Sequence, residues 1–162
     1  AVIQPASNAQ SGPARIVAFG QSATDVNFYL AQDGTDLIVR LRTTDTGTSA
    51  SPDITVPNVL DSSSQQHLLV TYDQEQVRVY VNGVAVHSVA RTGELANWDP
   101  TALIAVANDP TSDKPWRGKL FKVVVWDQAF DGGQAGRTYS GDDPGLPGGA
   151  GGTFSAVWDE RP

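Results

Sequence analysis

The side chains that could perform acid–base chemistry are few in this sequence. The glutamates are Glu75, Glu94 and Glu160, and the histidines are His67 and His87. Glycoside hydrolysis by two carboxylates requires a pair of acids that face one sugar ring. No glutamate has a carboxylate two to four residues away within one strand-like segment, and the adjacent acids at 159–160 point to opposite faces of any strand. The sequence therefore does not predict a two-carboxylate glycosidase.

Other common catalytic arrangements are also missing from the sequence. Cysteine is absent, which excludes a thiolate nucleophile, a thiolate zinc site and a disulfide framework. The nucleophile motif G-x-S-x-G does not occur, and neither histidine has partners at metal-ligand spacing. We therefore expect a non-catalytic protein whose two histidines lie on the surface of a sheet.

Two loop-like segments carry the oxygen ligands that calcium prefers. Asn97 and Asp99 occur in "NWDP", and Asn108, Asp109 and Asp113 occur in "NDPTSD". Calcium takes several oxygen ligands from flexible loops, and these amides and carboxylates could supply them. Asn and Asp before proline also favour turns without any metal. Both interpretations of the two loops, calcium site and plain turn, remain open; no other cofactor is predicted.

Two of the four tryptophans, Trp98 and Trp116, fall in these same loops. A loop tryptophan offers a large flat surface on which a sugar ring can stack. It can equally close the end of a hydrophobic core. Trp98 and Trp116 are thus the candidates for ligand stacking, and packing is the interpretation that we favour.

The elements that must position these residues are β-strands. Short runs rich in β-branched and aromatic residues alternate with Gly, Pro, Asn, Asp and Ser, and no segment shows a capped helical period. The glycines of "DGGQAGRTY" make that stretch a poor helix candidate. The predicted strands are "ARIVAF", "NFYLAQ", "LIVRLRT", "HLLVTY", "VRVYVN", "VAVHSV", "ALIAVA", "LFKVVVWD" and "FSAVWD".

Three hairpins connect these strands in the predicted order. Asn82 and Gly83 separate two alternating runs, and this dipeptide tolerates the positive φ of a type I′ turn. A second hairpin turns around residues 73–76 and a third at residues 33–34. Sequential hairpins and about nine strands predict an all-β fold with two packed antiparallel sheets.

Length and charge bound the class of partner. The chain has 162 residues and a formal net charge of −7, with no long basic run and no apolar run long enough to span a membrane. We therefore expect no insertion into a membrane, and no binding to nucleic acid or to anionic membrane surfaces, since binding to polyanions requires clustered positive charge. The start "AVIQPAS", which lacks Met, suggests a processed, secreted or cell-surface chain.

The central and later segments resemble a known family. "HLLVTYDQEQVRVYVNGVAVHS" is similar to the central hairpins of laminin-G-like, or concanavalin A-like, jelly-roll domains, and "LANWDPTALIAVANDPTSDKPWRGKLFKVVVWDQAF" is similar to their ending. A bacterial branch of these domains is similar to the earlier segment "SGPARIVAFGQSATDVNFYLAQDGTDLIVRLRTTDTG". The resemblance as a whole covers residues 1–130. It implies a β-sandwich of the jelly-roll class, allows a calcium site, and places tryptophan at both loop positions.

The two ends depart from the family pattern. Residues 1–130 begin inside an early strand of the family, residues 131–152 have the composition of a Gly/Pro-rich linker, and residues 153–162 contain one more alternating strand. Phe154, Ala156 and Trp158 share one face of that strand. We expect them to dock on a sheet edge in cis or in a neighbouring subunit.

This pattern predicts two functions of different class. The first is an extracellular structural or adhesive module that assembles head to tail with copies of itself into a filament, by donating its C-terminal strand. The alternative is a lectin-like module that binds carbohydrate or protein, with calcium as a candidate cofactor and a glycan as a candidate partner.

Overall fold

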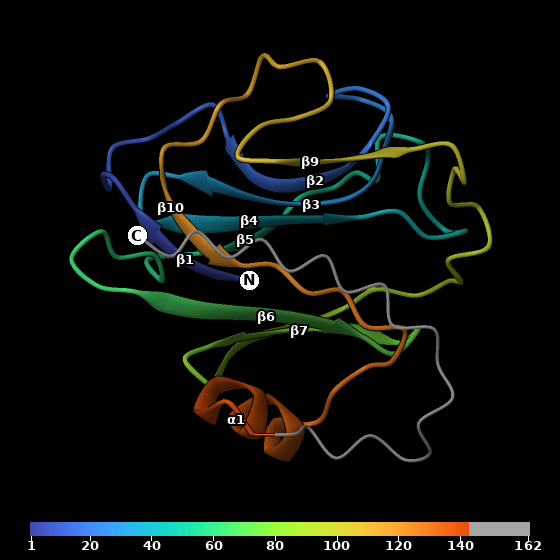
Figure 1. Ribbon diagram of the computed structural model, residues 1–162. Coiled ribbons are helices and arrows are strands. Elements are labelled where there is room, and N and C mark those ends of the chain that lie inside the picture. Colours follow the sequence, from blue (N-terminus) through green and yellow to red (C-terminus); the bar gives the residue numbers. More distant parts are fainter. Residues whose placement is uncertain (143–162) are drawn as a thin grey trace. The chain divides into compact units, whose positions relative to one another are not determined.

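The computed structural model describes residues 1–142, and the chain within it forms two compact units. One unit comprises, of the described residues, 1–4, 63–91 and 119–142; we call it the hairpin unit. The other comprises residues 5–62 and 92–118; we call it the loop unit. Each unit contains one five-stranded sheet, which confirms the prediction of an all-β fold with two antiparallel sheets (Figure 1).

The sheet of the loop unit has the strand order β5-β4-β3-β2-β9, and every neighbouring pair is antiparallel. Its apolar positions give a nearly continuous core, with Ile16, Val17 and Leu37 at most 2 % exposed. Burying each such side chain contributes roughly 1.5–3 kcal/mol. The strands are β2 (Ala14–Gly20), β3 (Val26–Asp33), β4 (Asp36–Leu41), β5 (Ile54–Val56) and β9 (Leu103–Val106).

The sheet of the hairpin unit has the strand order β10-β1-β6-β7-β8. Alternate residues of its central strands are fully buried, including Leu68, Val77 and Val79. This is the period-two pattern read from the sequence. The strands are β1 (Val2–Pro5), β6 (Gln66–Tyr72), β7 (Gln76–Val81), β8 (Val84–Ala90) and β10 (Gly118–Lys122).

The three predicted hairpins are confirmed. β3 pairs with β4, β6 with β7, and β7 with β8, each in antiparallel register. Asn82 and Gly83 have φ angles of +51° and +79°, as a type I′ turn requires. Two short strands, β1 and β5, were not among the predicted segments; β5 lies in a stretch whose polar residues and prolines favour a loop.

Residues 132–140 differ from the sequence prediction, which assigned 131–152 to a linker. They form helix α1 (Gly132–Ser140), which is closed by a capping box between Asp131 and Gln134 and by Gly141 at φ +82°. The buried Ala135 packs in a cluster with Leu69, Tyr80 and Phe130. These caps and this burial offset the low helix propensity of the three glycines.

The predicted C-terminal strand, with Phe154, Ala156 and Trp158, lies outside the described residues, as do residues 143–152 of the predicted linker. Within residues 1–142, no helix has the length and apolar character needed to cross a bilayer.

Candidate functional site

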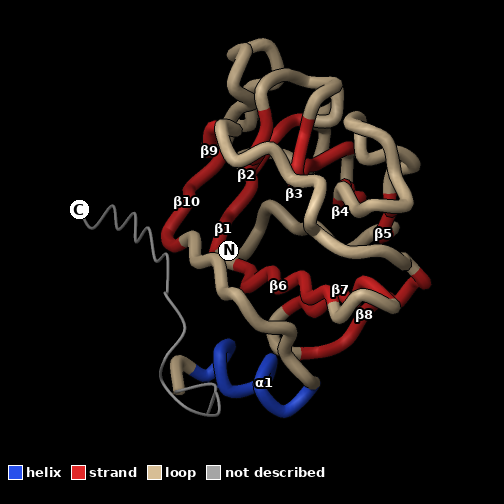
Figure 2. The backbone as a smooth tube through the Cα atoms, turned by 90° about the vertical axis from the view of Figure 1, so that its right-hand side faces the viewer, coloured by secondary structure: helices blue, strands red, loops and turns tan. Residues whose placement is uncertain are grey.

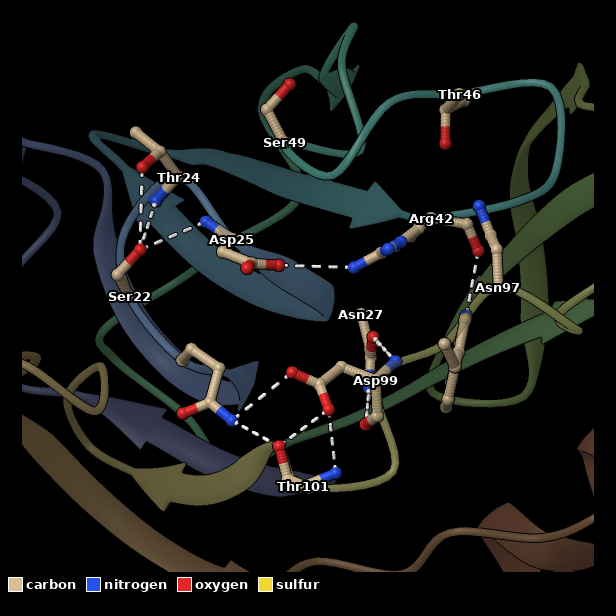
Figure 3. A network of polar contacts seen from close by, with 12 residues as sticks. Ser22, Thr24, Asp25, Asn27, Arg42, Thr46, Ser49, Asn97, Asp99 and Thr101 are labelled. Carbon is tan, nitrogen blue, oxygen red and sulfur yellow. Dashed lines mark hydrogen bonds and ion pairs between the residues drawn. The ribbon is translucent and has the colours of Figure 1, made fainter.

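Polar side chains from three segments gather at one end of the sheet of the loop unit (Figure 3). The segments are the β2–β3 turn with the start of β3, the chain that follows β4, and the loop that precedes β9. We call this group the polar site. Its members are Gln21, Ser22, Thr24, Asp25, Asn27, Arg42, Asn97, Trp98, Asp99 and Thr101.

The β2–β3 turn is built by a close main-chain approach and a serine hydroxyl. A Cβ atom on Gly20 would lie 2.5 Å from the carbonyl oxygen of Asp25, so only glycine fits this position without a shift of the main chain. The Ser22 hydroxyl accepts a hydrogen bond from the Asp25 N–H at 3.1 Å. The turn thus presents the Asp25 carboxylate, which accepts from Arg42 Nη1 at 3.1 Å.

Asn27 ties the loop before β9 to β3. Its Nδ2 donates to the carbonyl of Asp99 at 3.0 Å, and its Oδ1 accepts from the N–H of Asp99 at 2.9 Å. The side chain of Asn27 is only 1 % exposed. Because one amide pairs with both main-chain groups of a single residue, the position of this loop is fixed against the sheet.

The carboxylate of Asp99 is held by its own loop. Its Oδ1 accepts from the N–H and the hydroxyl of Thr101 at 2.8 and 2.7 Å, and its Oδ2 accepts from Gln21 Nε2 at 3.2 Å. These bonds, first of all the one from the Thr101 hydroxyl, hold the pKa of Asp99 below its ordinary value. Asp99 is therefore an anion with fixed direction at neutral pH.

Trp98 is the aromatic residue of the polar site. Its ring stacks on Phe28 at 5.9 Å between centroids and meets Phe19 edge-on at 5.6 Å. Its Nε1 donates to the carbonyl of Arg42 at 2.8 Å. The ring is half-buried, so it packs in the protein and keeps part of its surface accessible.

Two buried polar atoms of the polar site have no hydrogen-bond partner among the described residues. They are Nε of Arg42, a donor, and Oδ1 of Asn97, an acceptor. The other amide atom of Asn97 donates to the carbonyl of Thr43 at 2.7 Å. A buried polar group without a partner costs about 1–3 kcal/mol, so these two atoms mark where the hydrogen bonding of the polar site is incomplete.

A second polar group in the loop unit surrounds Tyr29, which is fully buried. The guanidinium carbons of Arg15 and Arg40 lie 3.5 and 5.1 Å from its ring centroid, and its hydroxyl donates to Asp53 at 2.7 Å. Burial and the hydrogen bond to Asp53 raise the pKa of Tyr29 to about 12. For Asp53, burial alone would raise the pKa, but the bonds from Arg40 and Tyr29 outweigh it and lower the pKa.

The calcium candidates fall into two separate hydrogen-bond networks. Asn97 and Asp99 belong to the polar site, whereas Asn108, Asp109 and Asp113 form the loop after β9. In that loop Asn108 Oδ1 accepts from the main chain of Asp109 and Lys114, as in a turn. Among residues 1–142, no three His, Asp or Glu side chains gather into a cluster suited to a metal ion. Calcium thus stays a prediction.

The two tryptophan candidates for ligand stacking have different surroundings. Trp116 is only 4 % exposed and donates from Nε1 to Gln32 Oε1 at 2.8 Å inside the protein. Trp98 is half-buried in the polar site. Of the pair, only Trp98 has ring surface that a ligand can reach.

Sequence reasoning missed Asp25, Asn27 and Arg42. Arg42 and Asp25 lie in different segments, and Asn27 sits inside a strand, where an amide reads as a surface residue. The only sequence signal was "GQSATD", a cluster of turn residues between two strong strands. It predicts a turn and gives no indication of which loop the turn meets.

Comparisons with known proteins agree with the fold. The family model of the concanavalin A-like lectin/glucanases superfamily matches residues 1–135. A search of curated proteins finds no match to the chain.

Three solved structures share the fold at low sequence identity. The heptameric SAP-like pentraxin of Limulus polyphemus has a TM-score of 0.66 and 16 % identity, over 88 % of this chain and 68 % of that one. A candidate carbohydrate binding protein of Bacteroides ovatus has a TM-score of 0.61 and 18 % identity, over 84 % of this chain but only 38 % of its own length. The CBM40 of a Ruminococcus gnavus IT-sialidase, bound to α2,3-sialyllactose, has a TM-score of 0.56 and 15 % identity, over 72 % and 68 % of the two chains.

Proposed function

Because this chain belongs to the concanavalin A-like lectin/glucanases superfamily, we propose that it is a non-catalytic, lectin-like binding module of a secreted or cell-surface protein. The proposed ligand is a hydroxyl-rich glycan, and the proposed binding surface is the polar site of the loop unit. The similar structures include a carbohydrate-binding module with its bound sugar, which supports this class of ligand.

The observation that carries the proposal is the pair of unpartnered buried atoms beside an aromatic ring. Arg42 Nε and Asn97 Oδ1 supply one donor and one acceptor, and a sugar hydroxyl can satisfy either kind of atom. Trp98 supplies a flat apolar surface next to them. The two negative charges of Asp25 and Asp99 exceed the single positive charge of Arg42. The polar site therefore favours a neutral sugar over an acidic one.

The chemistry of the polar site does not favour catalysis. Its two carboxylates accept hydrogen bonds from Arg42 and from Thr101, respectively, and the pKa of Asp99 is lowered, whereas a general acid needs a raised one. The site therefore supports recognition of a ligand rather than proton transfer to it.

The test compares two aspartates that make the same kind of ion pair. Asp25→Asn weakens the pair with Arg42 in the polar site, and Asp73→Asn weakens the matched pair with Arg78, at 2.6 Å, in the hairpin unit. A glycan array first identifies a neutral oligosaccharide, and calorimetry then measures its Kd. We expect roughly tenfold weaker binding for Asp25→Asn, as for loss of a charge-assisted hydrogen bond, and an unchanged Kd for Asp73→Asn. Equal effects of the two variants would overturn the proposed site.

Strand donation remains a second candidate, because β9 is an apolar edge strand. Within the described residues β9 pairs with β2 alone, and Leu103, Ile104 and Val106 are 61, 46 and 42 % exposed. Such an edge favours the addition of a further strand. The proposed donor is the segment 153–159 of another copy. Light scattering should show that deletion of residues 153–162 converts an oligomer into a monomer; an intact chain that is already monomeric would contradict donation in trans.

Calcium is proposed for the loop after β9 rather than for the polar site. Thr111 Oγ1 lies 3.1 Å from Oδ1 of both Asp109 and Asp113, so its one hydroxyl hydrogen is shared between the two carboxylates. Asp109 is 2 % exposed, and its Oδ2 has no hydrogen-bond partner among the described residues. Two carboxylates close together with a free oxygen fit a divalent cation, for which main-chain oxygens or water would complete the ligand set.

A further inference from the structure

The hairpin unit contains a pocket that the proposed glycan site does not use. Its volume is about 450 Å³, and its walls come from β1, β6, the turn after β7, the chain at and after β10, and the end of α1. Figure 2 shows α1 beside the β7–β8 hairpin at this end of the unit. A volume of this size suits a small molecule, since ligand pockets commonly measure about 300–1,000 Å³.

Two amines line the pocket, the amine of Ala1, which donates to the carbonyl of Leu68 at 2.7 Å, and that of Lys122, which has no ion-pair partner among the described residues. His67 lines the same pocket, and burial first, then the charges of the N-terminal amine and of Lys122, lower the pKa of His67 to about 4. Burial, and after it the charge of Lys122, also lowers the pKa of the Ala1 amine to about 5. Both His67 and that amine are therefore neutral at physiological pH, and Lys122 is the positive group that a bound anion would meet.

The same wall offers an unpartnered polar atom. Nδ1 of His67 is buried and has no hydrogen-bond partner within the described residues. Its ring centroid lies 6.0 Å from that of Tyr139. Asn82 also lines the pocket, and its Oδ1 accepts a hydrogen bond from the main-chain N–H of His67 at 2.8 Å. The buried atom of His67 and the amide of Asn82 can each hydrogen-bond to a hydroxyl group.

Aromatic rings form the apolar part of the pocket. Trp126 and Tyr139 both line it. The ring of Trp126 packs against that of Phe130, with 4.9 Å between the ring centroids. A ring fixed by packing loses little entropy when a ligand covers it. Flat aromatic surfaces beside amide and hydroxyl groups suit the ring of a sugar, which is apolar on its faces and polar at its rim.

We propose that this pocket binds an acidic monosaccharide. Its carboxylate would pair with Lys122, its ring would lie against Trp126 and Tyr139, and its hydroxyls would reach His67 and Asn82. A single ammonium group matches a singly charged carboxylate, and the Asp142 carboxylate in the wall opposes a doubly charged phosphate. The inference goes beyond the glycan site of the loop unit, because it concerns other residues and a ligand of different charge.

The experiment uses the full chain and two sugars that differ by one carboxylate, D-galacturonate and D-galactose. Nuclear magnetic resonance follows the indole N–H signals of Trp126 and Trp98 during titration. We expect galacturonate to shift the Trp126 signal with a Kd on the order of 1 mM, and to bind roughly tenfold more tightly than galactose. Lys122→Gln should remove that tenfold difference, whereas Lys119→Gln, an exposed lysine of the same strand, should preserve it.

Three results would overturn the proposal. The first is that galacturonate, at a concentration on the order of 50 mM, does not shift the Trp126 signal. The second is that the Lys122→Gln variant still prefers galacturonate over galactose tenfold. The third is that galacturonate shifts the signal of Trp98 alone. The last result would move the acidic sugar to the polar site of the loop unit and leave the pocket without this ligand.

Discussion

The two units carry sheets of equal strand number but differ in how their connections are held. In the hairpin unit β6, β7 and β8 follow one another through turns at 73–75 and 82–83, fixed by local contacts such as the Asp73 carboxylate accepting from the main chain of residues 75 and 76. In the loop unit the long-range hydrogen bonds of the polar site join residues 54 to 80 positions apart. One unit is thus specified mainly by neighbours in sequence, and the other by distant partners.

This difference decides where each unit is sensitive to change. A local turn fails when its own backbone conformation is forbidden, as at Gly83. A loop held by distant side chains fails when one remote amide is lost, as at Asn27. The predictions below change one of these features at a time.

The largest effect is expected for Gly83→Val in the hairpin unit. Gly83 has φ +79°, and a Cβ atom there would lie 3.2 Å from two atoms of Tyr139. Backbone strain and overpacking together should lower the free energy of unfolding by about 3 kcal/mol. Chemical denaturation measures it, with Gly47→Val as the control, because no atom lies within 4 Å of a Cβ there. A similar loss in both variants would contradict the importance of the turn.

Asn27→Ala should have the next largest effect, of about 2 kcal/mol, and should act on the loop unit. It removes the bonds at 3.0 and 2.9 Å that hold both main-chain groups of Asp99. Hydrogen exchange should show faster opening of residues 97–101 while the 82–83 turn stays protected. Asn8→Ala, at an exposed residue that accepts from the N–H of Ser62, is the matched control. Unchanged exchange at 97–101 would refute the role given to Asn27.

Calcium should stabilise the loop unit by about 1.4 kcal/mol when its concentration is ten times the Kd. A thermal scan with chelator, and then with calcium restored, measures the effect. Asp109→Asn should abolish the shift, whereas Asp33→Asn, at the β3–β4 turn, should preserve it. If the wild-type midpoint does not move at millimolar calcium, the loop after β9 binds no calcium under these conditions.

The smallest expected effect is on the pH dependence of stability, which we expect to differ between the two units. Acid and alkali should each lower the free energy of unfolding by on the order of 1 kcal/mol after solvent screening. The pKa of His67 is lowered to about 4, so its contribution is present above its unfolded value near 6.5 and is lost as pH falls toward 4. The pKa of Tyr29 is raised to about 12, so its contribution is present below about 10 and is lost as pH rises toward 12. Acid should therefore weaken the hairpin unit and alkali the loop unit.

Resonance titrations of the His67 imidazole and the Tyr29 ring, with hydrogen exchange in each unit, test this division. His67→Gln should remove the acid sensitivity of the hairpin unit, and Tyr29→Phe the alkaline sensitivity of the loop unit. A His67 pKa near 6.5 in the folded protein would contradict the buried, neutral imidazole.

The fold followed from the sequence because its signals are local. Alternating apolar residues mark eight of the described strands, and Asn82-Gly83 marks the tightest turn. Helix α1 was missed because its stability comes from the capping box of Asp131 with Gln134 and from the burial of Ala135, which outweigh its glycines. Propensity alone cannot weigh burial, since burial depends on the tertiary partner.

The candidate site was only half predictable for the same reason. Asn97, Trp98 and Asp99 stand out because their types and loop position suggest binding. Asn27 and Arg42 do not, since their roles arise from partners 72 and 17 positions away, Asp99 and Asp25. The pocket beside α1 is similarly hidden, because it depends on a helix that composition argues against.

The Asn82–Gly83 turn is also a site at which the asparagine can slowly deamidate. In an Asn-Gly pair the glycine nitrogen can attack the asparagine amide, close a succinimide ring and release ammonia, since no Cβ hinders its approach. Here Asn82 Oδ1 accepts a hydrogen bond from the main-chain N–H of His67 at 2.8 Å, and Tyr139 lies against Gly83. The attack therefore requires that this turn first opens locally. The slow appearance of aspartate and isoaspartate at position 82 in stored protein would therefore record how often this turn opens. Ageing of the molecule would begin at a hairpin and not at global unfolding.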